Sequence, residues 1–504
     1  MKKKNLFGAI GYVTVIMIFS RLLALVSTQV YMSFYGASDL YLNIYSYAIS
    51  IPNIIFTCFG TALSTVVIPI YTGYIATEKR EKAKSFADTL ITVTTVFTAL
   101  LVLVGIALSP ILPRFTSLGD YGFAVRALMI MMPAMLFYGL NYIFQGMLQS
   151  HGKYGWPAFV SVPSSLVVIL YVIFLGDTYG VSGLLVATLI GLSLQAFILV
   201  PPLVRTGYRY KASFDLKNPD MRVALRMTLP VLLGVSAYQM NMFYNTTMIA
   251  NFPGMVTLLT FVQNITLYLV LAFAYSITAV IYPRLTAYAA VDDMDSYKET
   301  LRKILNSVIL LLVPVTFGFI AVRQELLQLI SQWGKVTSSD IDAAAGLLCM
   351  YSIGILGIGM KEILDRAFYA LKKTFLPAVN GFVIMAVNIV LSQILMRKMG
   401  ANGIPLAYSV ASLTGTAVLL FALRRKIGPY GKGIGTTFIK SIFAAAVMFV
   451  CVLFLNRVLG NALPGNTLLF RLVRLGVPCM AGVLIYGILA LILGLLPKRG
   501  GKTA

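Results

Sequence analysis

Charged side chains inside long apolar segments are the residues of this sequence most able to do chemistry. Arg21 lies in the middle of one such segment, IFSRLLAL. An arginine at that depth in a bilayer costs about 2.5–3.5 kcal/mol on insertion scales, so it should face a wet cavity or a partner. Because a guanidinium binds phosphate oxygens with two parallel hydrogen bonds, Arg21 is a candidate for binding an anionic substrate group. The alternative is a structural ion pair between helices.

A second group of charges lies near the end of another apolar segment. Lys361 and Asp365 are four residues apart, as are Glu362 and Arg366. On a helix this spacing lets each pair neutralise itself. The pairs could equally act as a gate that opens and closes as a transporter changes conformation, so both interpretations stay open.

Uncharged polar residues in apolar segments extend the list of candidates. Asn53 follows Pro52, which should bend its helix and expose backbone carbonyls. Asn245 and Asn264 lie in two later segments and could line the same cavity as Asn53, or form hydrogen bonds between helices. Asp39 follows a Gly-Ala-Ser turn; it is a gate candidate, and the interpretation that we favour is that it caps the helix that starts there.

Three further basic residues, Lys440, Arg471 and Arg474, lie in the last two apolar segments. Arg471 and Arg474 are three apart and so share one helix face. They are candidates for a lipid-binding groove, and the alternative is that their side chains extend to lipid headgroups.

Motifs for enzymatic chemistry are sparse. The sequence contains no Walker A, HExxH or GxSxG pattern, and the four cysteines lie in apolar segments without metal-binding spacing. The acidic run Asp292–Asp295 is best explained as a solvated loop with helix-capping residues. We therefore expect no catalytic residues, no metal and no cofactor.

The composition indicates the class of protein in which these residues lie. Of 504 residues, 59% are hydrophobic and 11% charged, whereas a soluble domain has about 25% charged residues. A soluble enzyme, a disordered chain and a secreted disulfide scaffold are excluded. An all-α polytopic membrane protein remains, because helices satisfy their own backbone hydrogen bonds in lipid.

Apolar runs of about 20 residues predict about fourteen transmembrane helices. They lie near residues 9–33, 40–75, 84–110, 123–149, 155–176, 181–204, 221–250, 255–288, 297–322, 340–370, 374–396, 402–424, 434–458 and 467–496. With the N-terminus in the cytoplasm, 26 Lys and Arg residues fall in cytoplasmic segments and 6 in outer ones. This asymmetry predicts that both termini are cytoplasmic, and it explains most of the +23 net charge without nucleic acid.

The two halves of the chain resemble each other. An offset of 214 residues aligns Pro69 with Pro283, and an offset of 220 aligns Gly180 with Gly400. We expect two parallel six-helix lobes, a plan in which transporters bind substrate between the lobes. The predicted domains are 1–205 (spans 1–6), a cytoplasmic linker 206–220, 221–425 (spans 7–12) and 426–504 (spans 13–14 and a basic tail).

Several segments together resemble the MviN/MurJ family of lipid II flippases. They are SRLLALV (20–26), YGASD (35–39), IPNIIF (51–56), ALSTVVIPIYTGY (62–74), LPVLLGVSAYQMN (229–241), SITAVIYPRLTAYAA (276–290) and DRAFYALKKTFLPAVNG (365–381). Arg21 matches the first cavity arginine of that family. The positions that match its other cavity charges hold Ser27, Thr28, Phe56 and Asn264 instead.

The resemblance implies a flippase of the bacterial cytoplasmic membrane. Its substrate would be a polyprenyl-diphosphate-linked peptidoglycan precursor, moved from the inner to the outer leaflet by alternating access. Its partners would be that lipid-linked saccharide, bilayer lipids, and a coupling ion or the membrane potential. The alternatives are a flippase for another lipid-linked oligosaccharide, a cation-coupled multidrug exporter of the same fold, and a membrane-embedded transferase.

Overall fold

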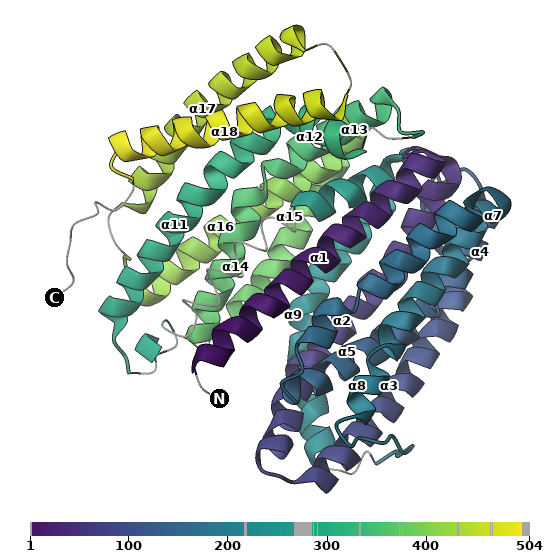
Figure 1. The fold of residues 1–504 in the computed structure, drawn as a ribbon. Helices are drawn as coiled ribbons and strands as arrows, with labels where there is room; N and C mark the ends of the chain where they lie inside the picture. Colours follow the sequence, from purple (N-terminus) through teal and green to yellow (C-terminus); the bar gives the residue numbers. More distant parts are fainter. Residues whose placement is uncertain are drawn as a thin grey trace. The chain divides into compact units, whose positions relative to one another are not determined.

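Helices account for nearly all of the regular structure in the computed structural model (Figure 1). The structure describes residues 3–215, 219–266, 285, 287–289, 291–331, 334–371, 373, 375–430, 433–463, 465 and 467–495. Most of the second part of predicted span eight and the basic C-terminal tail lie outside these residues. The predicted class, an all-α polytopic membrane protein, is confirmed in the described part of the chain.

The first half of the described chain contains α1 (Lys3–Tyr35), α2 (Leu40–Ala76), α3 (Arg80–Leu108), α4 (Tyr121–Met131), α5 (Ala134–Ser150), α6 (Gly155–Phe159), α7 (Val162–Phe197) and α8 (Val200–Val204). The second half contains α9 (Pro219–Ile249), a short helix at Met255–Thr266, α11 (Met294–Ala321), α12 (Arg323–Ser331), α13 (Ser338–Ser352), α14 (Ile355–Ala370), α15 (Phe375–Met399), α16 (Gly403–Ile427), α17 (Ile434–Ala462) and α18 (Leu468–Ile492). Single 3-10 turns occur at Leu112–Phe115 and Gly400–Asn402.

Eight segments of the described chain are long and apolar enough to cross a membrane, and nine if the bent pair α13–α14 forms one span. Two of the eight, 155–204 and 375–427, each cover two predicted spans. Since several predicted spans merge in this way, the helix pattern is consistent with about fourteen crossings.

The segment Val162–Phe197 folds back on itself at Gly180, whose φ of 56° and ψ of −150° interrupt the helix. Tyr171 donates a hydrogen bond to the Gly180 carbonyl, 2.7 Å away, and Gln195 donates to Ser164, 2.6 Å away. In a straight helix, residues 164 and 195 would lie about 45 Å apart. A positive φ is easy for glycine alone, which explains why the turn between predicted spans five and six occurs there.

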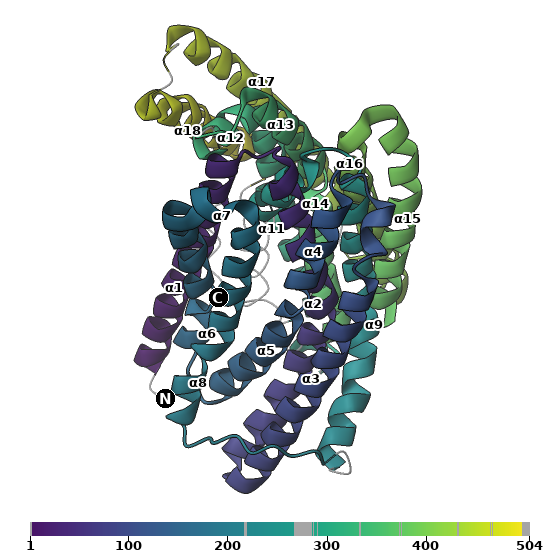
Figure 2. The same ribbon diagram turned by 90° about the vertical axis from the view of Figure 1, so that its right-hand side faces the viewer.

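The chain forms two compact units. The first comprises Met1–Thr257 and Trp333–Val336; the second comprises Leu258–Gln332 and Thr337–Ala504. In the first unit α2 packs against α5 and α9, and α3 packs against α5 (Figures 1 and 2). The boundary predicted at residues 206–220 divides the chain between its two similar halves in the sequence. It stays a prediction.

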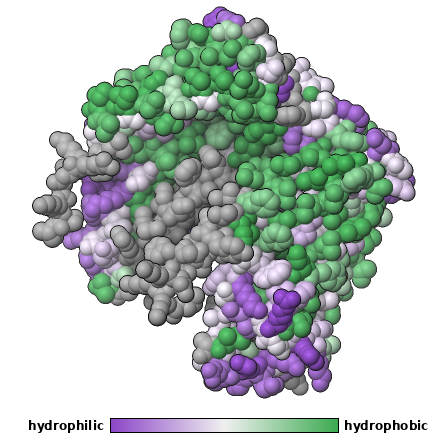
Figure 3. All heavy atoms as spheres, viewed as in Figure 1, coloured by the Kyte–Doolittle hydropathy of each residue, from purple (hydrophilic) through white to green (hydrophobic). Residues whose placement is uncertain are grey.

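The second unit is organised around α11, which packs against α14 and α17. Its buried core includes Leu305, Ile309 and Leu312 of α11 together with Leu364 and Phe368 of α14. Helices α15 and α16 pack side by side in the same unit (Figure 2). The outward side chains of α17 and α18 are mostly apolar (Figure 3), as expected for helices in contact with lipid.

Candidate functional site

Arg21 lies on α1, and its side chain is exposed. The neighbouring Ser20 is buried and donates a hydrogen bond to the carbonyl of Ala158, 2.8 Å away. This contact holds that turn of α1 against α6 and leaves Arg21 on the adjacent face. There the guanidinium interacts electrostatically with the phenolic oxygen of Tyr142 on α5.

Asn53 on α2 is also exposed, whereas its neighbours Pro52 and Ile54 are buried. The Thr57 hydroxyl donates to the Asn53 carbonyl oxygen, 2.7 Å away, and the Asn53 side chain is hydrogen-bonded to the hydroxyl of Tyr138 on α5. The structure therefore brings polar groups of α1, α2 and α5 together. We call the five residues that supply them the Arg21 cluster: Arg21, Asn53, Thr57, Tyr138 and Tyr142.

Phe56 is fully buried and packs against the two tyrosines of the Arg21 cluster. Its ring stacks on Tyr138 at a centroid distance of 6.4 Å and contacts Tyr142 at 6.1 Å. A position that matches a cavity charge in the resembling family is thus part of the hydrophobic core here, and tyrosine hydroxyls supply the polar groups beside it.

The two tyrosines of the cluster were not among the residues singled out in the sequence. Their signal was available, because Tyr138 and Tyr142 are four apart in an apolar segment and so share a helix face. The same segment carries Asn141 and Gln145. Asn141 donates to Gln195 at 3.3 Å and accepts from Gln145 at 3.0 Å, which ties α5 to α7 inside the first unit.

The other two predicted substrate residues lie elsewhere. Asn245 is on α9, is 3% exposed and belongs to the first unit, where α9 packs along α2. Asn264 is half-buried and belongs to the second unit. Arg21 interacts with Tyr142, and Asn53 interacts with Tyr138, both on α5. The substrate-binding roles of all four predicted residues stay predictions.

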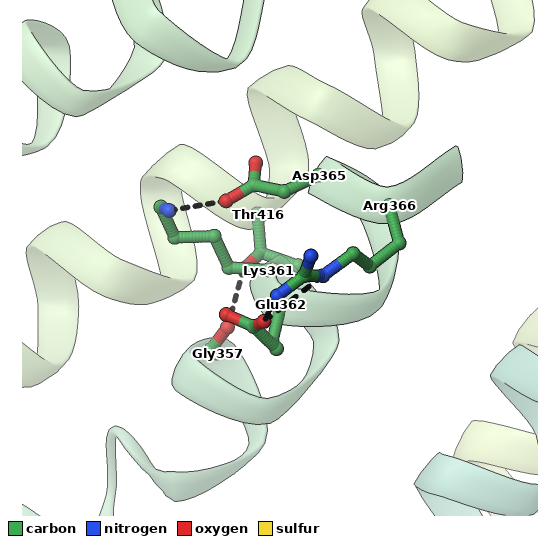
Figure 4. Close-up of polar contacts among 6 residues, drawn as sticks. All are labelled: Gly357, Lys361, Glu362, Asp365, Arg366 and Thr416. Carbon is green, nitrogen blue, oxygen red and sulfur yellow. Dashed lines mark hydrogen bonds and ion pairs between the residues drawn. The ribbon is translucent and has the colours of Figure 1, made fainter. Parts of the chain in front are cut away.

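The charges near the end of span ten form two ion pairs on α14 (Figure 4). Lys361 Nζ lies 2.6 Å from Asp365 Oδ2, and Arg366 Nη2 lies 2.9 Å from Glu362 Oε1. Asp365 is the most buried of the four, at 7% exposed. The spacing-based prediction of two i,i+4 pairs is confirmed, and the gate role stays a prediction.

Asp39 caps α2, as the sequence predicted. Its Oδ1 accepts a hydrogen bond from the backbone N–H of Leu42 at 2.9 Å. The acidic run before α11 also contains a cap, because Asp293 accepts from the N–H of Ser296 at 3.0 Å. Hydrogen bonds from the Ser296 hydroxyl and the Ser296 N–H to the ionised carboxylate lower the pKa of Asp293.

The three groove candidates make contacts at opposite ends of α18. Lys440 of α17 donates to the carbonyl of Leu493 at the C-terminal end of α18, 2.9 Å away, where free carbonyls attract a cation. At the other end, Arg471 donates to the carbonyl of Gln328 on α12 at 3.1 Å, and Arg474 interacts electrostatically with Glu325. Burial raises the pKa of Glu325, and the nearby arginines offset part of that effect.

The segment after α8 is held along α3. Asp88 Oδ1 accepts from the Tyr208 hydroxyl at 2.6 Å and from the Lys211 N–H at 3.2 Å, and Thr92 accepts from the Ser213 N–H at 3.2 Å. We call residues 208–213 the linker strap. Burial and the Asp88 carboxylate raise the pKa of Tyr208 above its ordinary range.

A second set of contacts occurs in the first unit where α1 and α2 meet. Asn43 Oδ1 accepts from the N–H groups of Val256 and Thr257, at 2.9 and 3.4 Å, and so caps the helix Met255–Thr266. The hydroxyls of Ser46 and Thr257 lie 2.7 Å apart. The N–H of Lys335 also donates to the carbonyl of Ser33 at 2.6 Å.

Comparisons with known proteins indicate one family. A family model described as lipid II flippase MurJ matches residues 33–473. A probable lipid II flippase MurJ from Treponema pallidum is 26% identical over 81% of this chain and 79% of its own length. One from Bdellovibrio bacteriovorus is 25% identical over 76% of this chain and 75% of its own length.

Solved structures agree at the level of the fold. A lipid II flippase MurJ in an inward closed conformation superposes with a TM-score of 0.79 at 22% identity, covering 95% of this chain and 98% of that one. An inward-facing multidrug resistance MATE transporter gives a TM-score of 0.65 at 15% identity, covering 83% of this chain and 98% of that one.

Proposed function

Because the chain belongs to the lipid II flippase MurJ family, we propose that it moves a polyprenyl-diphosphate-linked peptidoglycan precursor, lipid II, across the bacterial cytoplasmic membrane. The cargo passes from the inner to the outer leaflet by alternating access. The observation that supports this proposal beyond family membership is Arg21, a cation in an otherwise apolar helix that interacts electrostatically with the hydroxyl of Tyr142 on α5.

The chemistry of the cluster suits a diphosphate linked to a saccharide. Arg21 supplies the positive charge and two parallel donors for phosphate oxygens. Asn53 supplies amide groups that hydrogen-bond sugar hydroxyls. Asn245 and Asn264 are proposed to contact the headgroup at a later stage of the cycle.

Alternating access needs contacts that form and break at both membrane faces. With both termini in the cytoplasm, Asn43, Ser46 and Ser33 lie at the outer ends of their helices, where their contacts hold the outer face closed. We assign the inner gate to Lys361, Glu362, Asp365 and Arg366, with Asp39 fixing the start of α2 at the outer end. A coupling ion or the membrane potential supplies the driving force.

Lys440, Arg471 and Arg474 are proposed to border the surface on which the lipid tail rests. Exposed apolar side chains of α18, such as Met480, Val483 and Leu484, supply the lipid-facing surface between them. The basic groups lie at the two ends of this surface, near the lipid headgroups of the inner and outer leaflets.

The proposal is tested by complementation. Arg21→Ala should fail to support growth of a strain depleted of its own flippase, while the protein still accumulates in the membrane, and Arg21→Lys should restore growth in part. Normal growth with Arg21→Ala would rule out the assigned role of this residue.

A second candidate function is multidrug export, because MATE transporters share the fold. Cation-coupled export uses a carboxylate within the membrane. In the first unit Asp88 holds the linker strap and Asp39 caps a helix, so these two carboxylates are structural. Purified protein that bound lipid II no better than other polyprenyl-linked glycans, together with drug resistance in cells, would favour export.

A further inference from the structure

Three aromatic rings pack together in the first unit where α2 and α5 meet. Phe56 of α2 stacks on Tyr138 of α5, with the ring planes 21° apart and the centroids 6.4 Å apart. The Phe56 ring also lies 6.1 Å from the ring of Tyr142, at an angle of 36°. Tyr138 and Tyr142 are four residues apart and so lie on one face of α5. We call Phe56, Tyr138 and Tyr142 the aromatic platform.

Two glycines allow this close packing. A Cβ atom at Gly60 of α2 would overlap ring carbons Cδ2 and Cε2 of Tyr142, so that ring rests directly on the α2 backbone. A Cβ atom at Gly139 of α5 would lie 3.3 Å from Cζ of Phe56, closer than a Cβ atom ordinarily lies to a neighbour. Each helix therefore accommodates a ring of the other helix at a glycine, and the backbone of both helices fixes where the platform lies.

The platform has a covered side and an accessible side. Phe56 is fully buried, whereas Tyr138 and Tyr142 are each partly exposed. Within one turn of Phe56 on α2, Asn53 is exposed, and the Thr57 hydroxyl donates to the Asn53 carbonyl at 2.7 Å. An exposed amide is costly against acyl chains. The accessible side of α2 at this level therefore suits water or a polar ligand.

Aromatic faces with polar groups nearby form the kind of surface that a sugar ring fits. The face of an aromatic ring carries partial negative charge, which attracts the weakly positive C–H groups on one side of a pyranose ring. The sugar hydroxyls point outward from the edge of that ring, where amide and hydroxyl groups hydrogen-bond them. A diphosphate and a polyprenyl chain offer no flat ring of this kind.

We propose that Tyr138 and Tyr142 bind a sugar ring of the lipid-linked saccharide by stacking, and that they determine specificity for the saccharide part of the cargo. The inference rests on the proposed function, because it assigns a binding surface to one part of that substrate. Phe56 supports the two tyrosine rings from the buried side, and Gly60 lets the Tyr142 ring lie flat against α2.

The test compares two ligands of the purified full-length protein in lipid nanodiscs. One is lipid II, and the other is a polyprenyl diphosphate of the same chain length, which lacks the sugars. Tyr138→Leu and Tyr142→Leu remove an aromatic face, and each should weaken lipid II binding about tenfold, comparable to the loss of one nucleic-acid base stacked on an aromatic side chain. Binding of the polyprenyl diphosphate should not change in either variant.

Conservative variants separate stacking from other effects of the tyrosines. Tyr138→Phe and Tyr142→Phe keep the aromatic face, so they should retain most of the affinity for lipid II. Tyr121→Leu is the matched control, because it removes an exposed tyrosine of α4 in the same unit, and it should bind both ligands like the unaltered protein.

The glycine provides a second, independent test. Gly60→Ala should displace the Tyr142 ring and weaken binding of lipid II while binding of the polyprenyl diphosphate is unchanged. Gly73→Ala changes another glycine of α2, with open space around its Cβ position, and should have no effect on either ligand. The thermal unfolding temperature of each variant shows whether it is folded.

Two outcomes would overturn the inference. One is an equal loss of both ligands in the leucine variants, and the other is unaltered lipid II binding by Tyr138→Leu, Tyr142→Leu and Gly60→Ala. Failure of the proposed function is distinct, because the unaltered protein would then bind no lipid II before any variant is compared, and the inference would fall with it.

Discussion

At the scale of single residues, the same charge pattern leads to different energetics in the two ion pairs of α14. The Asp365 side chain is 10% exposed and that of its partner Lys361 29%, whereas Glu362 and Arg366 are 24% and 37% exposed. Burial makes an unpaired charge costly, while a pair near solvent contributes little net stability. The Lys361–Asp365 pair is therefore the one on which the stability of this helix depends.

Asp365→Asn should destabilise the protein by about 3 kcal/mol, because it leaves the Lys361 ammonium without its partner in a mostly buried place. Glu362→Gln is the matched control and should cost less than about 1 kcal/mol. Thermal unfolding of the purified variants in one detergent compares them directly. Equal losses for the two substitutions would contradict the assignment of the buried pair.

At the scale of elements, the segment that follows α8 is held by side chains of α3 rather than by secondary structure of its own. The linker strap is not helical, yet its backbone N–H groups at Lys211 and Ser213 bond to Asp88 and Thr92 of α3. The hydroxyl of Tyr210 also lies 2.9 Å from that of Thr92. Asp88 accepts two hydrogen bonds, from the Tyr208 hydroxyl and the Lys211 N–H, and so fixes the first part of the strap.

Asp88→Ala should release the strap from α3. Trypsin cleaves after Arg209 and Lys211, which are exposed but held in place, so cleavage at these sites should become about tenfold faster in the variant, since the segment opens more readily. Limited proteolysis followed by mass spectrometry measures the rate. Glu81→Ala, an exposed acidic residue in the first turn of the same helix, should leave the rate unchanged. Slow cleavage in both variants would show that the strap does not depend on Asp88.

At the scale of the whole molecule, transport requires that some contacts persist through the cycle and that others break. The contact of Ser46 with Thr257 lies where the helix Met255–Thr266 begins, and that helix continues into the second unit. The contact of Thr89 with Ser213, at 3.3 Å, joins α3 to the linker strap, and both contacts lie within the first unit. The first should break when the outer face opens, and the second should not.

Disulfide bonds at these two places should have opposite effects. In a background without the native cysteines Cys58, Cys349, Cys451 and Cys479, Ser46→Cys with Thr257→Cys should stop flipping when oxidised and recover on reduction. Thr89→Cys with Ser213→Cys should flip lipid II at a normal rate in both redox states. The measurement is the amount of lipid II that reaches the outer leaflet of vesicles. Undiminished flipping with the first disulfide in place would contradict the assignment of this contact to the outer gate.

The sequence alone determined the class of the protein and several local features. The scarcity of charge excluded a soluble fold, and i,i+4 spacing determined the pairs of α14, because helix geometry fixes which side chains are neighbours. The Asp39 cap followed from the residues around it for the same reason. Each of these features depends on positions close together in the chain.

Only the tertiary structure decided which distant residues meet. Nothing in the spacing of Arg21, Asn53, Tyr138 and Tyr142 indicated that α1 and α2 would each interact with α5 through them, since this depends on how the helices pack. The structure also buried Phe56 and tied Arg471 to the carbonyl of Gln328. The local sequence determines which side chains lie on each face of a helix, whereas the packing of the helices decides which residues each of these side chains contacts.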